Sequence, residues 1–205
     1  MLLPTSLIRM APWAHALVGE VLKPGALAVD LTAGNGRDTL FLYRLVGDQG
    51  RVVAFDVQDE ALQATSRLLE DEGATIACDR LMAGASCAEP GIYLIQDCHS
   101  RLADYLREPV TAMVANLGFL PGEDTAWATA SPATLSALRS ALALLVPGGR
   151  LAVICHVGHP GGIAEAEKVG HLFAGLPSEY WDVLQLTAAN RRDAPSLLVV
   201  ERRPL

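Results

Sequence analysis

Polar side chains that can bind ligands or move protons recur in this chain directly after short apolar runs. Each run is short and apolar enough to be a buried β-strand. Because the carboxyl ends of parallel strands meet at one edge of a sheet, we expect these polar groups to line one crevice. Turn capping explains a single acid at such a place. Polar groups after five consecutive strands favour a ligand site: Asp30, Asp56, Asp97 with His99, Asn116, and His156 with His159.

The stretch LAVDLTAGNGRD, residues 27–38, predicts a strand, a glycine turn and a helix in succession. Gly34 and Gly36 let the backbone turn sharply and let a ligand approach closely. The free N–H groups at the start of the helix favour an anion or a polar ligand edge. The dinucleotide fingerprint G-x-G-x-x-G is incomplete, because Thr39 stands in the third glycine's place. A pyrophosphate loop is therefore disfavoured, and an ordinary tight turn is the alternative.

Asp56 follows Gly36 at close to the spacing expected of an acid that binds ribose hydroxyls. A carboxylate accepts two hydrogen bonds in that position. Gln58 could support the same edge, and a plain strand-end cap is the alternative for Asp56. For His99, a ligand-binding role and a histidine that is hydrogen-bonded only within its own loop are almost equally good interpretations.

Length and composition favour one globular domain, residues 1–205. The chain has 205 residues, of which 51% are hydrophobic and 19% charged, and this composition predicts a packed core rather than disorder. No apolar run approaches the roughly 18 residues of a membrane span, and the first residues lack the pattern of a secretory signal. The four cysteines include no C-x-x-C pair. We therefore expect a cytoplasmic protein with reduced thiols.

The net charge of −7 argues against a protein that covers nucleic-acid phosphates broadly. A nucleic acid held through one base and a local basic patch is still compatible with it, and a small-metabolite substrate suits it as well. Each candidate patch is alternatively a solvated surface pair. The candidates are Arg101 with Arg107, Arg191 with Arg192, and Arg202 with Arg203.

His156 and His159, with glycines around them, invite comparison with a metal site. Two histidines three residues apart are too few for zinc, and no third ligand is evident. We expect no metal and a loop that lines the substrate, with His159 able to titrate near neutrality.

Alternating strand and helix patterns predict a doubly wound, mostly parallel α/β sheet. We expect an N-terminal helix over about residues 7–22, a turn at Pro147–Gly149, and an irregular insertion over about residues 73–91 without an assigned role. The last two strands, 180–187 and 196–201, have only a loop between them, which suits an antiparallel pair. The five earlier strands are expected at 27–30, 51–56, 93–97, 110–116 and 150–156.

The spacing of Asp30, Thr32, Gly34 and Gly36 resembles the first motif of class I S-adenosylmethionine methyltransferases, D-x-G-x-G-x-G, with Thr32 in place of the first glycine. That resemblance implies seven strands in the order 3-2-1-4-5-7-6, with the last strand antiparallel. It also implies that Asp56 binds the ribose and that the Asp97 segment holds the adenine. Asn116-Leu117-Gly118-Phe119 stands where amine-directed members have an Asn/Asp-Pro-Pro-aromatic run.

Taken in order, DLTAGNGRDT, FDVQ, QDCHS, NLGFLPGED, HVGHPGG and Asn190 resemble the bacterial family long labelled putative rRNA methylases. Members of that family are tRNA methyltransferases that convert 5-aminomethyl-2-thiouridine at the wobble position to its 5-methylaminomethyl form. Two features depart from the family pattern. Asn190 is followed by Arg191, Arg192 and a single Pro195 where the family has Pro-Pro, and the segment 73–91 is longer than usual.

The resemblance implies the cofactor S-adenosylmethionine and in-line methyl transfer to a neutral amine, without a metal or a covalent intermediate. Asn116 would align the amine, while Phe119 or His159 holds the base. A small-metabolite or rRNA methyltransferase and a non-catalytic binding module are the alternatives. The oligomeric state is left open, with a homodimer as one option. The expected cofactor-binding residues are Asp30, Thr32, Gly34, Asn35, Gly36, Asp38, Thr39, Asp56, Gln58, Asp97, Cys98, His99, Asn116 and Gly118.

Overall fold

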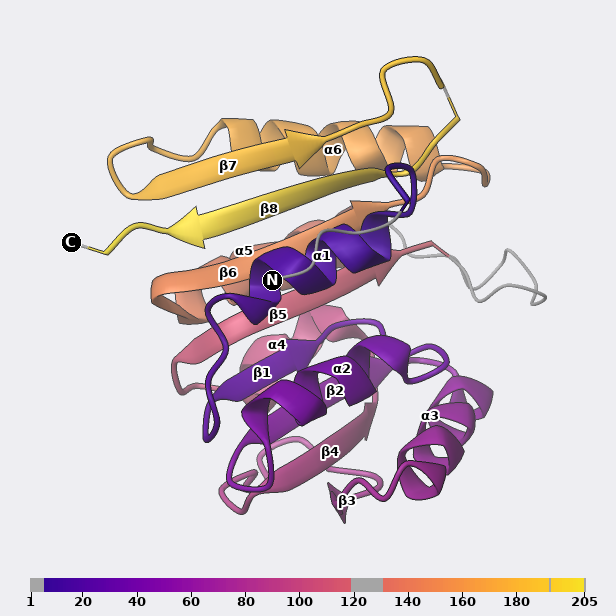
Figure 1. The fold of residues 1–205 in the computed structure, drawn as a ribbon, viewed down its shortest axis with the longest axis vertical. Coiled ribbons are helices and arrows are strands. Elements are labelled where there is room, and N and C mark those ends of the chain that lie inside the picture. The colour runs from indigo at the N-terminus through magenta and orange to yellow at the C-terminus, as the bar shows by residue number, and fades with distance from the viewer. Residues whose placement is uncertain (1–5, 119–130, 192, 205) are drawn as a thin grey trace.

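An eight-stranded sheet runs through the computed structural model, which describes residues 6–118, 131–191 and 193–204 (Figure 1). The strand order is β3-β4-β2-β1-β5-β6-β8-β7. Strands β1 to β6 pair in parallel, and β8 runs antiparallel to both β6 and β7. The strands are β1 Leu27–Asp30, β2 Arg51–Asp56, β3 Ile76–Cys78, β4 Gly91–Gln96, β5 Val110–Leu117, β6 Leu145–Cys155, β7 Trp181–Leu186 and β8 Ser196–Arg202.

The predicted strand order is confirmed, with one strand added. Without β3, the order reads 3-2-1-4-5-7-6, and the last strand is antiparallel as expected. The additional strand lies in the segment 73–91, which we expected to be irregular. Ile76 pairs with Ile92 of β4, so part of that segment forms the outer edge of the sheet. Its three residues are too few to show a clear alternation of buried and exposed side chains, so the sequence pattern missed them.

The predicted turn at Pro147–Gly149 is wrong, because β6 continues through these residues. Val110 pairs with Leu145 and Ala112 with Arg150, so the register shifts between the two pairs. A Cβ on Gly149 would lie 2.7 Å from the carbonyl oxygen of Thr111. The glycine therefore allows close approach of two strands at an irregularity, where the local sequence alone predicts a turn.

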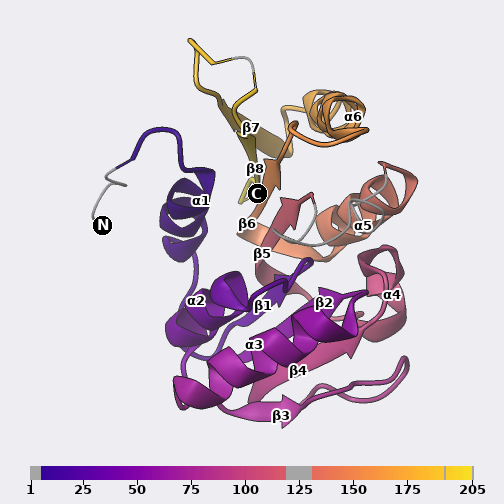
Figure 2. The same cartoon turned by 90° about the vertical axis from the view of Figure 1, so that its right-hand side faces the viewer.

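Helices cover both faces of the sheet, as Figure 2 shows. One face carries α1, α2 and α3, whose apolar residues Val18, Leu42 and Leu62 lie in one buried cluster. The other face carries α4, α5 and α6, and Leu138 and Phe173 lie in the second cluster. The helices are α1 Met10–Gly19, α2 Arg37–Val46, α3 Asp59–Asp71, the 3₁₀ turn η1 His99–Arg101, α4 Leu102–Tyr105, α5 Ser131–Leu144 and α6 Gly162–Ala174.

Helix α1 is shorter than the predicted 7–22 and runs antiparallel to β6. Midway along β6, Arg150 donates to the carbonyl of Leu17 in the last turn of α1 and to Glu20 directly after the helix. Nearer the start of α1, Nε2 of His15 lies 2.6 Å from Oδ1 of Asp38 in the first turn of α2. The beginning of α1 therefore lies toward the carboxyl ends of the parallel strands. No helix among the described residues is long and apolar enough to cross a bilayer.

Candidate active site

The carboxyl ends of β1, β2, β4, β5 and β6 bring together most of the residues that the sequence singled out. Asp30, Asp56 and Asn116 end or nearly end their strands, and His156 follows β6 directly. Pairing of Asp30 with Val114, and of Asn116 with Ile154, aligns three of these strand ends. The expected crevice edge is thus a real feature of the fold.

Hydrogen bonds from both sides hold the glycine loop between β1 and α2. The backbone N–H of Gly34 donates to Oδ2 of Asp56 at 2.9 Å, and the hydroxyl of Thr65 donates to the carbonyl of Gly34 at 3.0 Å. Gly36 has φ +77°, and a Cβ there would lie 2.9 Å from Cα of Thr65 on α3. The loop therefore needs glycine both for its left-handed conformation and for the closeness of α3.

Asp30 lies beneath the loop, with no exposed surface. It accepts hydrogen bonds from the Thr39 hydroxyl at 2.7 Å and from the backbone N–H of Thr32 at 3.0 Å. Burial, followed by the charge of Asp38, raises the pKa of Asp30 to about 7. Thr39 is also fully buried. Both residues therefore shape the loop from below, and any effect on a ligand passes through the backbone.

Asp56 is partly buried and lies at the surface of the crevice edge. Its two oxygens accept the N–H groups of Gln58 at 3.0 Å and of Gly34 at 2.9 Å. Burial raises the pKa of Asp56, and these hydrogen bonds oppose that rise. A carboxylate has about four lone-pair sites, so Asp56 keeps capacity for two hydroxyl groups of a ligand. The acceptor oxygens of Asp56 thus fit a ribose that has both hydroxyls free.

Asp97 is more committed to the protein than the sequence suggested. It accepts from Arg101 and from the Tyr105 hydroxyl, both at 2.7 Å, and from the backbone N–H of Cys98 at 2.8 Å. Burial and the hydrogen bond to Asp97 raise the pKa of Tyr105 to about 12. Asp97 therefore braces the turn after β4, and little of its acceptor capacity is left for an adenine amine.

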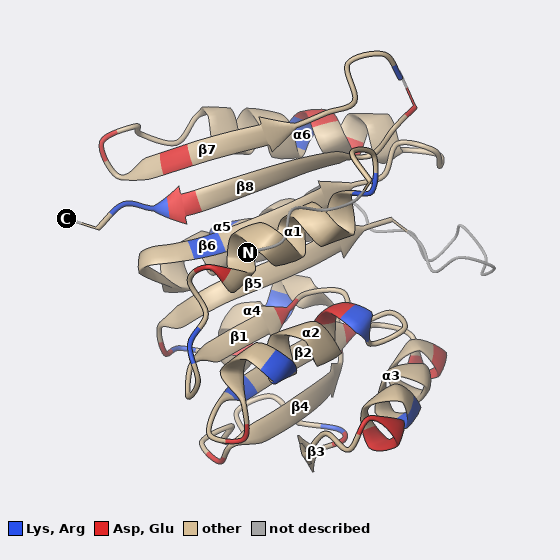
Figure 3. Cartoon of the chain, in the orientation of Figure 1, with Lys and Arg blue, Asp and Glu red and all other residues tan. Residues whose placement is uncertain are grey.

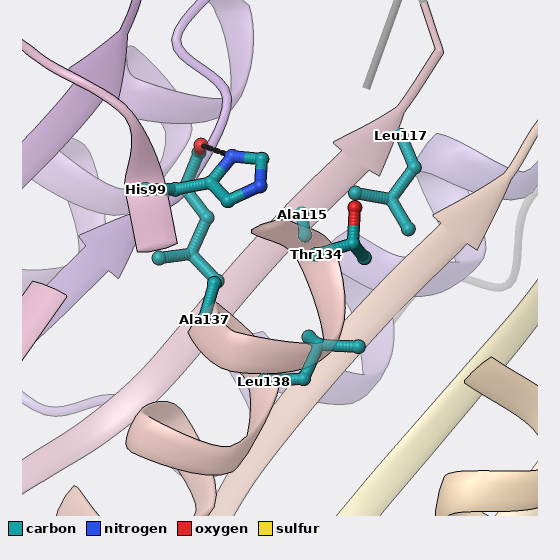
Figure 4. Close-up of a pocket in the computed structure, with 7 residues that line it drawn as sticks. His99, Ala115, Leu117, Thr134, Ala137 and Leu138 are labelled. Carbon is teal, nitrogen blue, oxygen red and sulfur yellow. Dashed lines mark hydrogen bonds between the residues drawn. The ribbon is translucent and has the colours of Figure 1, made fainter. Parts of the chain in front are cut away.

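His99 lies over a small apolar recess between β5 and α5 (Figure 4). Its Nδ1 lies 3.2 Å from the carbonyl oxygen of Leu31, so Nδ1 carries the hydrogen and donates. Its Nε2 is buried and has no hydrogen-bond partner among the described residues. Burial lowers the pKa of His99. The ring is therefore neutral, and it links the loop after β4 to the end of β1. The recess is lined by Leu31, His99, Ala115, Leu117, Thr134, Ala137 and Leu138.

Asn116 joins three strand ends. Its backbone N–H donates to Oγ1 of Thr32 at 2.7 Å, and its side-chain oxygen lies 2.9 Å from Nε2 of His156. Thr32 belongs to the glycine loop, so the ends of β1, β5 and β6 are connected through one residue. The sequence grouped His156 with the loop histidines but did not predict its contact with Asn116, which lies 40 residues away in the chain.

His159 is buried, and its Nδ1 lies 3.1 Å from the carbonyl oxygen of Pro160. A Cβ on Gly162 would lie 2.9 Å from Nε2 of His159, so the ring packs against the start of α6. In the described parts of the chain, no group of three or more His, Cys, Asp or Glu residues is arranged to hold a metal. The absence of a catalytic metal stays a prediction.

The remaining predicted residues are distributed around this edge. Asn35 is exposed at the tip of the glycine loop, and Gln58 and Cys98 are half-buried.

Asp38 faces away toward α1, where it contacts His15. The His15 ring stacks on Phe41, with 3.8 Å between the ring centroids. Gly118 follows β5 with φ +154°. Phe119 lies outside the described residues. Nothing in the sequence pattern identified Thr65, Tyr105 or His15 as supports of the site.

The family model described as "Putative rRNA methylase" matches residues 52–202. A curated protein of Arabidopsis thaliana, named tRNA (mnm(5)s(2)U34)-methyltransferase, chloroplastic, is 36% identical over 93% of this chain and 68% of its own length. The chain belongs to this methylase family. It is an S-adenosylmethionine-dependent methyltransferase.

Solved structures of similar proteins agree in fold and extent. A putative rRNA-methylase from Clostridium thermocellum has a TM-score of 0.84 and 33% identity, covering 96% of this chain and 99% of that one. A putative methyltransferase from Streptococcus mutans, solved in complex with SAH, has a TM-score of 0.80 and 31% identity, covering 95% and 98%. The class I methyltransferase fold is therefore shared over almost the whole length of these methylases.

Proposed function

We propose that this methyltransferase methylates the aminomethyl group of 5-aminomethyl-2-thiouridine at the wobble position of tRNA. The Arabidopsis relative carries the name of a tRNA methyltransferase for this class of uridine. The observation that carries the proposal within the structure is the position of Asn116. It lies between the glycine loop, through Thr32, and the loop after β6, through His156. A residue at this junction can align an acceptor amine with a methyl donor.

The proposed cofactor site follows the glycine loop and the end of β2. Gly34, Asn35 and Gly36 would lie along the methionine part, and Asp56 with Gln58 would hold the ribose. The carboxylates of Asp30, Asp38 and Asp56 lie near enough for the latter two to raise the pKa of Asp30. A cationic sulfonium ligand would reduce this repulsion, which a neutral ligand would not.

The adenine would lie against the turn at Cys98 and His99. Because Asp97 is bonded to Arg101 and Tyr105, we assign it a positioning role in that turn. Asn116 and Gly118 would lie beside the methyl group, with Phe119 and His159 on the side of the base. Asp30, Thr32, Asp38 and Thr39 would act by holding the loop.

The chemistry needs a neutral amine held in line with the sulfonium. The enzyme lowers the pKa of an ammonium group when it removes the group from water. The methyl group of a sulfonium is already activated, so orientation supplies most of the acceleration.

Two of the three arginine patches expected from the sequence suit a tRNA partner poorly. Figure 3 shows acidic and basic residues interspersed along the ribbon. Several of the expected patches are neutralised: Arg101 pairs with Asp97 and Asp104, and Arg203 with Asp182. Arg107 precedes β5 and so lies at the opposite edge of the sheet.

Three exposed arginines near the carboxyl edge make no ion pair within the described part of the chain: Arg9, Arg37 and Arg191. Arg9 precedes α1 and Arg37 begins α2. Arg191 lies in the loop before β8, whose first residue pairs with the last residue of β6. We propose that these three residues contact tRNA phosphates around the crevice.

The deciding experiment is mass spectrometry of nucleosides from tRNA carrying the aminomethyl group, after incubation with the protein and S-adenosylmethionine. A gain of one methyl on that nucleoside is expected. Methylation of rRNA or of a small metabolite instead would replace the proposal, and the net charge of −7 keeps the metabolite in the test. A tRNA complex should also weaken steeply with salt. Arg37→Ala should lower the salt slope by about 1, and the matched variant Arg107→Ala should leave it unchanged.

We propose in addition that the chain forms one domain and acts in the cytoplasm. The sheet draws its strands from residues 27 to 202, so we treat residues 1–205 as a single domain. Because tRNA and S-adenosylmethionine are both found in the cell interior, we place the enzyme in the cytoplasm. A homodimer stays a prediction.

A further inference from the structure

The hydrogen bond to Asn116 fixes which nitrogen of His156 carries the proton. Nε2 of His156 lies 2.9 Å from Oδ1 of Asn116. A carbonyl oxygen only accepts, so Nε2 carries the hydrogen and donates it. In the neutral ring, Nδ1 is then an acceptor. Asn116 is itself held, because its backbone N–H donates to Thr32 at 2.7 Å.

The His156 ring lies at the mouth of the site. It is solvent-accessible, and it packs beside Gly118, where a Cβ would lie 3.5 Å from Cβ and 3.6 Å from Cδ2 of His156. Gly118 follows β5 directly, so the ring lies beside the segment proposed to bind the acceptor. His159, by contrast, is buried and faces its own loop and the start of α6.

The charge state of His156 suits a proton acceptor. Partial desolvation of the ring lowers the pKa of His156, and the nearby His159 lowers it further. From β5 the facing polar group is the neutral amide of Asn116. The ring is therefore unprotonated at neutral pH, and its Nδ1 can accept a proton.

We propose that His156 is a catalytic residue that accepts the proton from the methylated amine, with Asn116 fixing its tautomer. This inference rests on the proposed function. The amine lone pair forms the N–CH₃ bond while the S–CH₃ bond breaks, and that electron pair stays on sulfur. As the N–CH₃ bond forms, the nitrogen passes one proton to Nδ1 in the same step, so the product is the neutral secondary amine. His156 becomes an imidazolium and later releases the proton to water.

The first test separates the contact with Asn116 from the proton transfer. His156→Gln keeps an amide N–H near the position of Nε2 but removes the basic nitrogen. We expect a single-turnover rate lower by on the order of 100-fold, the usual range for a lost general base. Affinities for S-adenosylmethionine and tRNA should stay within about threefold, a change of under 1 kcal/mol. The control is His171→Gln on the exposed side of α6, which should keep the wild-type rate.

Chemical rescue gives a readout that a merely structural role would not move. Imidazole added to His156→Ala should restore part of the rate. Among substituted imidazoles of similar size, the restored rate should rise with the pKa of the added base. Rescue that is absent, together with a wild-type rate in His156→Gln, would overturn the proposal.

A third measurement needs no substrate. The ¹⁵N shifts of His156, assigned with the His156→Gln variant, should show the Nε2–H tautomer at neutral pH, and Asn116→Leu should give a mixture of tautomers. A mixture in the wild type would contradict the proposal. If the wild type does not methylate the aminomethyl uridine, the proposed function fails, but the tautomer result still stands. The rate tests are then run on whichever acceptor the wild type methylates.

Discussion

The two halves of the crevice edge are built from different kinds of hydrogen bond. In the donor half, at the ends of β1 and β2, the carboxylates of Asp30 and Asp56 accept backbone N–H groups of the loops that follow β1 and β2. In the acceptor half, at the ends of β5 and β6, Asn116 donates its backbone N–H to the Thr32 hydroxyl, and its side-chain oxygen bonds to the His156 ring. The donor half is therefore a cradle of backbone N–H groups held by carboxylates, whereas the acceptor half is a junction whose side chains can take part in chemistry.

The largest expected effect concerns the buried carboxylate of Asp30 in the donor half. The pKa of Asp30 is about 7, above its usual 3.8. A raised carboxyl pKa means that the folded state favours the proton. The protonated Asp30 therefore contributes to the free energy of unfolding at acid pH, and this contribution is lost as the pH rises toward 7.

Asp30→Asn should remove this pH dependence. Between pH 5 and pH 8, the free energy of unfolding of the wild type should fall relative to the variant by about 3 kcal/mol. Urea unfolding at both pH values measures the difference. Asp182→Asn, at an exposed carboxylate, is the control and should follow the wild type. Parallel curves for Asp30→Asn and the wild type would show that the buried charge costs nothing.

The next prediction concerns the cofactor side of the donor half. Asp56→Ala removes the acceptor proposed for the ribose hydroxyls and the support of the Gly34 N–H. Affinity for S-adenosylmethionine should fall by about 1.5–3 kcal/mol, or roughly 10- to 150-fold. Calorimetry gives the affinity directly. An unchanged value would remove Asp56 from the cofactor site.

Gly36 tests the fit of the glycine loop against α3. Gly36→Ala places a Cβ 2.9 Å from Cα of Thr65 in a left-handed conformation, so we expect a loss of about 2–3 kcal/mol in stability. Gly47→Ala is the matched control, because Gly47 also has positive φ but nothing within 4 Å of its Cβ. It should lose only about 1 kcal/mol. Equal losses would mean that backbone strain, not contact with α3, decides both.

The smallest effect should come from the contact between α1 and α2. His15→Ala removes the hydrogen bond to Asp38 and the stacking on Phe41. Since the pair is only partly buried, the cost should be about 1 kcal/mol. Thermal unfolding measures it, with cofactor affinity as the second readout. A large loss of affinity would extend the donor half to include α1.

The difference between the halves also explains what the sequence could predict. The strand order and the donor half depend on local patterns: apolar runs, the Gly34–Gly36 spacing, and acids that end strands. The sequence did not reveal the role of Asp97, because Arg101 and Tyr105 reach it only after the chain turns into η1 and α4. The His156–Asn116 contact likewise requires β5 and β6 to lie side by side in register. The His156–Asn116 relation, across 40 residues, therefore has no signature at short separation.

The central claim is that the cradle binds the methyl donor while the junction aligns the acceptor. It is tested most directly by comparing Asp56→Ala and Asn116→Ala in cofactor titration and in single-turnover methylation of tRNA carrying the aminomethyl group. Asn116→Ala should keep its cofactor affinity within a few-fold and lose on the order of 100-fold in rate at saturating cofactor. Asp56→Ala should lose affinity and recover most of its rate when cofactor is raised. An Asn116→Ala variant with a wild-type rate, or one whose only defect is cofactor binding, would contradict the division.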